Sequence, residues 1–130
     1  MIKEDIHVAA KILVVDDDQM NLMRAKMILS KGNYEVLQAD SGEAALNKLE
    51  EETVDLVLLD IEMPGMNGIT TLEKLRATTQ GEALSVLFMT GTYGAEEQAQ
   101  GERLGIKGCV QKPFLPQVIL EQVGEVLEKK

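Results

Sequence analysis

Several apolar segments of this sequence end on side chains that could bind a metal or take part in phosphoryl transfer. Two adjacent acids, Asp16 and Asp17, follow the first apolar segment, and Asp60 ends another. A hydroxyl, Thr90, and a lysine, Lys112, follow two further segments. Taken singly, such residues are more often structural than functional, since acids cap helices and lysines are usually solvated. Their shared position at the ends of apolar segments favours one common site.

The three acids indicate a divalent cation. Two carboxylates about 4 Å apart repel by roughly 4 kcal/mol at an effective dielectric constant of about 20, so three in one cleft need a nearby cation. No histidine or cysteine adjoins them, and oxygen ligands favour Mg²⁺ or Mn²⁺ over zinc. The run from Asp16 to Asp18 lacks the alternating acids and central glycine of a calcium loop. Mg²⁺ is therefore the expected ion, with Mn²⁺ as the alternative.

An aspartate beside Mg²⁺ and a lysine is also the arrangement of a carboxylate nucleophile that forms an aspartyl phosphate. Asp60 would then be the nucleophile, while Lys112 and the metal offset charge on the transferred group. The Thr90 hydroxyl could donate a hydrogen bond to an equatorial oxygen. The structural alternative makes the first acids a helix cap, Asp60 a turn residue and Thr90 a satisfied hydroxyl at a strand end.

The apolar segments themselves predict a parallel sheet. The central segment, residues 54–60, is a nearly uninterrupted apolar run up to Asp60, with Pro64 and two glycines after it, as in a strand that is buried on both faces. Five such segments alternate with helical patterns, which favours right-handed crossovers and a three-layer α/β fold. Ligands of open parallel sheets bind at the carboxyl ends of the strands. The predicted strands are residues 11–16, 34–39, 54–60, 84–89 and 106–111.

Five helices are expected after these strands. Asp18 suits the N-cap of the first helix, whose apolar residues recur at helical spacing from Met20 onwards, and Gly32 suits its end. Residues 94–104 predict a weak helix, because its apolar side is mostly alanine and Gly101 interrupts it. The other start signals are Ser41 and Asn67 as N-caps and Pro116 in a first turn.

Composition limits the classes of protein to consider. With 130 residues, 45% of them apolar, the chain is expected to form a single domain over residues 1–130, with its core at about 11–127. A formal charge of −9 argues against direct nucleic-acid binding. The charged first residues and the short apolar runs argue against a signal peptide and a membrane span. Cys109 is the single cysteine, so no internal disulfide is expected and the chain is predicted to be cytoplasmic.

Four motifs resemble those of response-regulator receiver domains of the chemotaxis type, the phosphorylated modules of two-component signalling. They are VVDD at 14–17, LLDIEMPGMNG at 58–68, FMTG at 88–91 and KPF at 112–114. The set is specific in this order and spacing, although VVDD or KPF alone would be weak. The resemblance implies the flavodoxin-like strand order 2-1-3-4-5, in a doubly wound (α/β)5 fold. With that order, Asp16 and Asp17 would lie beside Asp60.

The resemblance also implies a role for each site residue. Asp60 would accept a phosphoryl group from a histidine kinase, a phosphotransfer protein or a small phosphodonor. Asp17, Asp60 and the backbone carbonyl of Glu62 would bind Mg²⁺, with Asp16 acting through water. The contacts to the phosphoryl group would come from the side chains of Thr90 and Lys112 and from backbone N–H groups, those of Ile61 and Gly91.

As a receiver, the chain would be a signalling switch that assists only its own phosphorylation and dephosphorylation. Its downstream protein or output domain is not named by the sequence, and the resemblance allows a dimer through the fourth helix, fifth strand and fifth helix. The chain would be either a stand-alone receiver or one excised from a longer protein. Two departures from the family are Cys109, where an aromatic residue is usual, and Gly91, where alanine is common.

Two rival functions remain open at this point. A phosphatase of the haloacid-dehalogenase type also uses Asp, Thr, Lys and an acidic pair. In that class, however, the nucleophile strand comes first and carries a second Asp two residues on, whereas here Asp60 follows the acidic pair and is followed by Glu62. The other rival is a pure binding module with a vestigial site, which the presence of all the site residues disfavours.

Overall fold

Five parallel strands form one sheet in the computed structural model, which describes residues 9–78, 81–92 and 94–128. The order β2-β1-β3-β4-β5 confirms the predicted doubly wound topology. Four strands begin one or two residues later than predicted, because apolar residues continue into the segments that enter the sheet. The strands are β1 (Lys11–Val15), β2 (Glu35–Ala39), β3 (Leu56–Asp60), β4 (Ser85–Thr90) and β5 (Gly108–Gln111).

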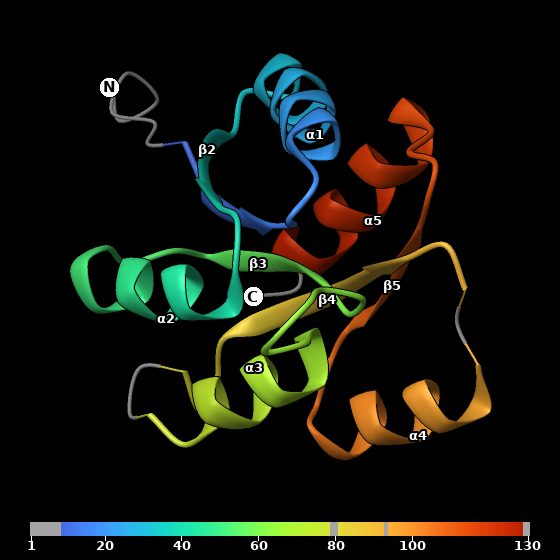
Figure 1. Ribbon diagram of the computed structural model, residues 1–130. Helices are drawn as coiled ribbons and strands as arrows, with labels where there is room; N and C mark the ends of the chain where they lie inside the picture. Colours follow the sequence, from blue (N-terminus) through green and yellow to red (C-terminus); the bar gives the residue numbers. More distant parts are fainter. Residues whose placement is uncertain (1–8, 79–80, 93, 129–130) are drawn as a thin grey trace.

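Helices cover both faces of the sheet and complete the three layers. Figure 1 shows α1 and α5 on one face and α2, α3 and α4 on the other. Each face has its own buried cluster of apolar side chains. The helices are α1 (Gln19–Lys31), α2 (Gly42–Glu51), α3 (Gly68–Arg76), α4 (Ala95–Arg103) and α5 (Pro116–Glu128).

The predicted helix starts are confirmed by their hydrogen bonds. The Asp18 carboxylate accepts from the Met20 N–H at 2.9 Å, and the Ser41 hydroxyl oxygen accepts from the Ala44 N–H at 3.0 Å. The Asn67 side chain accepts from the Thr70 N–H at 2.9 Å. Such caps satisfy N–H groups that have no partner within the helix. They fix where α1, α2 and α3 leave the carboxyl edge of the sheet.

The helix α4 is weakly anchored, as the sequence predicted. No side chain within the described part of the chain caps its start at Gly94, and only Gly101 is buried among its residues. Gly101 allows close packing, because an added Cβ would lie 2.7 Å from the Phe88 ring and 2.6 Å from the Ile106 side chain. The Arg76 guanidinium donates to the carbonyl oxygens of Leu104 at 2.8 Å and Gly105 at 3.3 Å, just past the end of α4. The anchors therefore lie at its C-terminal end.

The centre of the sheet is the most completely buried part of the fold. Every residue of β3 and β4 is buried, including Asp60 and Thr90 at their carboxyl ends. Complete burial of one leucine or valine side chain contributes about 1.5 to 3 kcal/mol. The two strands that end in site residues are thus held by packing on both faces.

The apolar residues that were predicted on α1 lie on two different sides of the helix. The structure buries Leu22, Ala25, Ile28 and Leu29 against the sheet, whereas the methionines lie on the outer side. A helix can turn only one stripe toward the core. The exposed fractions of Met20, Met23 and Met27 are 59%, 54% and 56%.

Candidate functional site

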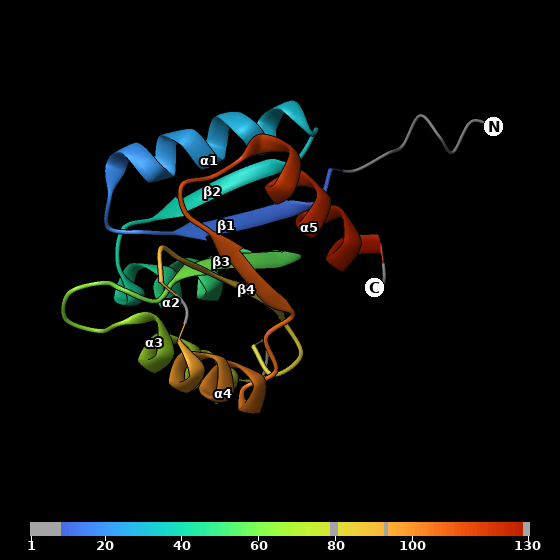
Figure 2. The same ribbon diagram turned by 90° about the vertical axis from the view of Figure 1, so that its right-hand side faces the viewer.

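The site residues gather at one edge of the sheet. Figure 2 shows the loops that follow β1, β3, β4 and β5 at the same end of the molecule, on the left of that view. Asp16 follows β1, Asp60 ends β3, Thr90 ends β4 and Lys112 follows β5. Because β1 and β3 are neighbours, the acids that follow them lie side by side.

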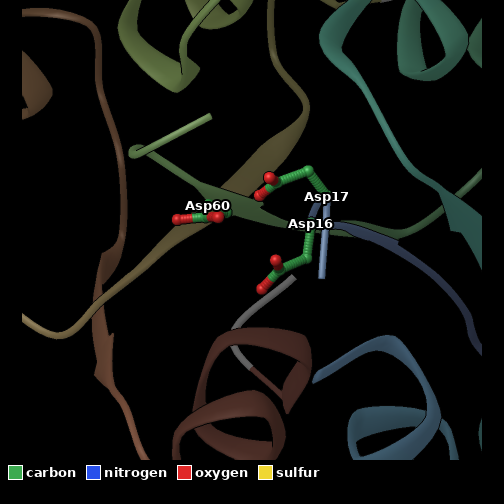
Figure 3. Close-up of side chains that lie close together, drawn as sticks. All are labelled: Asp16, Asp17 and Asp60. Carbon is green, nitrogen blue, oxygen red and sulfur yellow. The ribbon is translucent and has the colours of Figure 1, made fainter. Parts of the chain in front are cut away.

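Three carboxylates form the acidic part of the site. Asp16 and Asp60 are 0% and 1% exposed, and Asp17 is exposed at the rim. One oxygen from each lies within 4.8 Å of the others. Figure 3 shows the three side chains gathered at one place. All these donors are carboxylate oxygens, the ligand type of a hard divalent cation. The residues therefore fit Mg²⁺ or Mn²⁺, with one face open toward solvent through Asp17.

Lys112 lies between the two buried acids. Its ammonium nitrogen is 2.8 Å from Asp16 Oδ2 and 3.3 Å from Asp60 Oδ2. Burial alone would lower the pKa of Lys112, but its bond to Asp16 and the charge of Asp60 raise that pKa overall. The backbone N–H of Lys112 donates to the Thr90 carbonyl at 3.0 Å, and a cis peptide bond joins Lys112 to Pro113. The lysine thus stays charged beside the acids.

Burial raises the pKa of Asp60 to about 6. The negative charge of Asp16 adds to this increase, while the Glu62 N–H, which donates to Asp60 Oδ1 at 3.0 Å, and Lys112 oppose it. The carboxylate is therefore mainly ionised at neutral pH but more basic than an ordinary aspartate. A more basic carboxylate is a better nucleophile, provided it is deprotonated.

The Thr90 hydroxyl is turned toward its own loop. It is 1% exposed, donates to the Thr92 carbonyl oxygen at 2.5 Å and accepts from the Thr92 N–H at 3.1 Å. Thr92 in turn donates from its side chain to Glu62 Oε2 at 3.0 Å. The sequence did not predict this arrangement, because a local hydroxyl turn and a contact between two loops leave no periodic signal.

The structure corrects the expectation for the backbone N–H of Ile61. That N–H donates to the Met89 carbonyl at 3.2 Å and continues the pairing of β3 with β4. The N–H that points at the Asp60 carboxylate belongs to Glu62. Gly91 lies directly after β4, and an added Cβ there would contact nothing within 4 Å. The site therefore leaves open space beside Gly91.

The chain belongs to the response regulator receiver domain family, whose model matches residues 12–124. This family membership, together with the sheet order, confirms the resemblance found in the four motifs. Receiver domains of response regulators are signalling modules and not enzymes of the ordinary kind.

Known relatives differ in length. The chain is 30% identical to PilH and 32% identical to the chemotaxis protein CheY, both of Pseudomonas aeruginosa, and covers 98% and 97% of them with 91% and 92% of its own length. It is 33% identical to the transcriptional regulatory protein PhoP of Bacillus subtilis, of which it covers only 49% with 92% of its own length. The structure of the chemotaxis protein CheY4 of Vibrio cholerae superposes with a TM-score of 0.89 at 30% identity, over 92% of this chain and 100% of that one.

None of the helices in the described residues combines the length and apolarity that a membrane crossing requires.

Proposed function

We propose that this receiver accepts a phosphoryl group on Asp60 and thereby changes the surface that it presents to a downstream partner. The main observation that supports this proposal is the buried carboxylate of Asp60, whose Oδ2 lies 3.3 Å from Lys112 Nζ, beside a second buried acid, Asp16. An Asp60 oxygen would attack the phosphorus of a phosphohistidine or an acyl phosphate. The new P–O bond forms as the bond to the imidazole nitrogen or carboxylate oxygen breaks, and the leaving group keeps the electron pair.

The surrounding residues would divide the remaining work. Lys112 balances charge on the transferred group, and the Thr90 hydroxyl and the N–H groups of Glu62 and Gly91 donate to its oxygens. Asp17, Asp60 and the Glu62 carbonyl would hold Mg²⁺ or Mn²⁺, with Asp16 acting through water. When bound, this ion offsets negative charge on the phosphoryl oxygens. The rival phosphatase mechanism lacks support, because the residue two positions after Asp60 is Glu62, whose side chain bonds to Thr92.

Labelling by radioactive acetyl phosphate tests this proposal. The parent should be labelled in the presence of Mg²⁺, and Asp17→Asn should lose most of the Mg²⁺-dependent labelling because it removes one charged ligand. Asp18→Asn is the matched control, since asparagine also caps a helix and Asp18 lies outside the acid cluster. Unlabelled parent protein would support a vestigial site, and a full Mg²⁺ response in Asp17→Asn would place the ion elsewhere.

The phosphodonor would dock beside the site on what we call the methionine groove. Met20, Met23 and Met27 of α1 line it together with Phe114, Pro116 and Leu120. All strongly exposed large apolar side chains of the described residues lie on α1 or around the start of α5. Contiguous exposed apolar surface is typical of interaction sites, and methionine adapts to different partners.

The positive charge of α1 favours a phosphodonor protein whose docking helix carries acidic residues. The sequence of α1 contains Arg24, Lys26 and Lys31 and no acid, although the whole chain has a charge of −9. Since α1 starts at the carboxyl edge of the sheet, a helix lying in the groove would reach toward Asp60. Such a helix would come from a histidine kinase or a phosphotransfer protein.

A charged side chain in the methionine groove should weaken docking of the donor protein but should leave the reaction at Asp60 with a small phosphodonor nearly unchanged. We expect Met23→Glu to slow phosphotransfer from the cognate phosphohistidine donor at least tenfold, because a desolvated acid would meet an apolar and acidic helix. Labelling by acetyl phosphate should change less than twofold. Asn47→Glu, on the exposed side of α2, is the matched control. Equal slowing with both donors would show that the substitution disturbs the site and not a docking surface.

Other features of the proposed function come from the family alone. The chain would act as a single cytoplasmic receiver domain, and α4, β5 and α5 would carry the contact to an output domain, a separate protein or a second copy. The chain's coverage of only part of some relatives, such as 49% of PhoP, makes either arrangement compatible with membership of the family.

A further inference from the structure

A hydrogen bond joins two loops beside the phosphorylation site. The Thr92 hydroxyl, in the loop between β4 and α4, donates to Glu62 Oε2, in the loop between β3 and α3, at 3.0 Å. The backbone of Thr92 is at the same time paired with the Thr90 hydroxyl through both its N–H and its carbonyl. Glu62, Thr92 and Thr90 therefore form a continuous chain of hydrogen bonds.

This chain of hydrogen bonds engages the Thr90 hydroxyl within its own loop. A hydroxyl carries a single hydrogen, and that of Thr90 is donated to the Thr92 carbonyl. It must be released before Thr90 can donate to a phosphoryl oxygen on Asp60. If Thr90 moves toward Asp60, the backbone at Thr92 loses both of its bonds to the hydroxyl. The side-chain bond from Thr92 to Glu62 opposes that movement.

We propose that the Glu62 carboxylate is a positioning residue that acts through Thr92 as a latch on Thr90 in the unphosphorylated state. This inference rests on the proposed function and adds a way in which phosphorylation of Asp60 is regulated. A contact that exists in only one of two states shifts the equilibrium toward that state by its own free energy. The bond between the Thr92 and Glu62 side chains would thus lower the affinity of the site for a phosphoryl group, although neither of these two side chains contacts that group.

The size of the effect follows from the exposure of the bond. Both Glu62 and Thr92 are exposed, so water competes for the same donor and acceptor. A hydrogen bond of this kind contributes modestly, and its loss should increase the affinity for a phosphoryl mimic about threefold. Stability should hardly change, because neither side chain is buried.

A second mechanism must be separated from the latch. The Glu62 carboxylate is negative and close to the site of an anionic group, so Glu62→Gln would strengthen anion binding by charge alone. Thr92→Val removes the hydroxyl without changing the charge and keeps the branched shape. Combining the two substitutions gives a double-mutant cycle in which only coupled effects fail to add.

Beryllofluoride is a mimic of an acyl phosphate. Titration with it in excess Mg²⁺ measures how tightly it binds to the parent, Glu62→Gln, Thr92→Val and the double variant. Amide shifts of residues 90 and 92 report binding and the movement of the loop together. We expect Thr92→Val to bind about threefold more tightly than the parent, and Thr92→Ser, which keeps the hydroxyl, to match the parent. Glu62→Gln should have a smaller effect in the Thr92→Val background than in the parent.

Two results would overturn the latch while leaving the phosphorylation site intact. One is an unchanged affinity in Thr92→Val and in Thr92→Ala, which is included as a second removal of the hydroxyl. The other is an equal effect of Glu62→Gln in both backgrounds, which would reduce its role to charge. Failure of the parent itself to bind beryllofluoride would instead overturn the proposed function on which the latch depends.

Discussion

Asp60→Asn should raise the free energy of unfolding of the metal-free protein by about 2 to 3 kcal/mol at pH 7.5. The pKa of Asp60 in the fold is about 6, against an ordinary value of 3.8, so the folded protein holds this proton more tightly than the unfolded chain. Keeping the group ionised at neutral pH therefore costs stability. Asparagine has nearly the same shape, relieves the repulsion from Asp16 and leaves Lys112 paired with Asp16 at 2.8 Å.

The stabilisation by Asp60→Asn should depend on pH, whereas a stabilisation that comes from packing alone would not. Below about pH 4 the group is protonated in both states, and the advantage of asparagine should vanish. It should grow as the pH rises from about 4 to 6 and stay constant above that. Urea unfolding in EDTA at several pH values measures it, with Asp18→Asn as an exposed control. A stabilisation independent of pH would mean that Asp60 carries no raised pKa.

The same variant should not be labelled by acetyl phosphate, because an amide is no nucleophile for phosphorus. Added Mg²⁺ should reverse part of the stability difference, since the parent gains a carboxylate ligand that the variant lacks. Full labelling of Asp60→Asn would remove Asp60 from its proposed role.

The sequence predicted the framework because the framework rests on local and periodic rules. The apolar run of β3 reads as a buried strand, and Asp18, Ser41 and Asn67 have the short polar side chains that cap helices. The shared location of Asp16, Asp60, Thr90 and Lys112 could be predicted because each stands at the end of an apolar segment. Their mutual distances depend on the strand order, which the family resemblance supplied.

The features that the sequence did not predict depend on contacts between distant segments. The methionines of α1 have the same helical spacing as its core residues, and only the position of the sheet decides which set is buried. The Ile61 N–H is used in strand pairing, which no residue type reveals. Arg76 donates to carbonyls of two loops, including that of Leu84 at 2.6 Å. Backbone carbonyls exist at every position, so such a partner leaves no pattern in the sequence.

Gly68→Ala should lower the free energy of unfolding by about 3 kcal/mol and disturb the proposed phosphorylation site. Gly68 is the first residue of α3, and an added Cβ would lie 2.4 Å from the Asp60 carbonyl oxygen and 2.5 Å from Ile61 Cα. These are backbone atoms of a completely buried strand and of the residue after it, so no side chain can turn away to make room. The substitution would push the start of α3 off the end of β3.

Movement at this point acts directly on Asp60. Labelling of Gly68→Ala by acetyl phosphate should therefore be slowed even under conditions in which the variant remains folded, because the proposed nucleophile, Asp60, shifts relative to Lys112. Gly91→Ala is the matched control for stability, since its Cβ would meet nothing within 4 Å, and it should change the unfolding free energy by no more than about 0.5 kcal/mol. Circular dichroism during urea unfolding and labelling rates at low urea measure the two effects. If Gly68→Ala matched Gly91→Ala in stability, then α3 would be able to move away from β3 at little cost, and the close approach of these elements would not fix the position of Asp60.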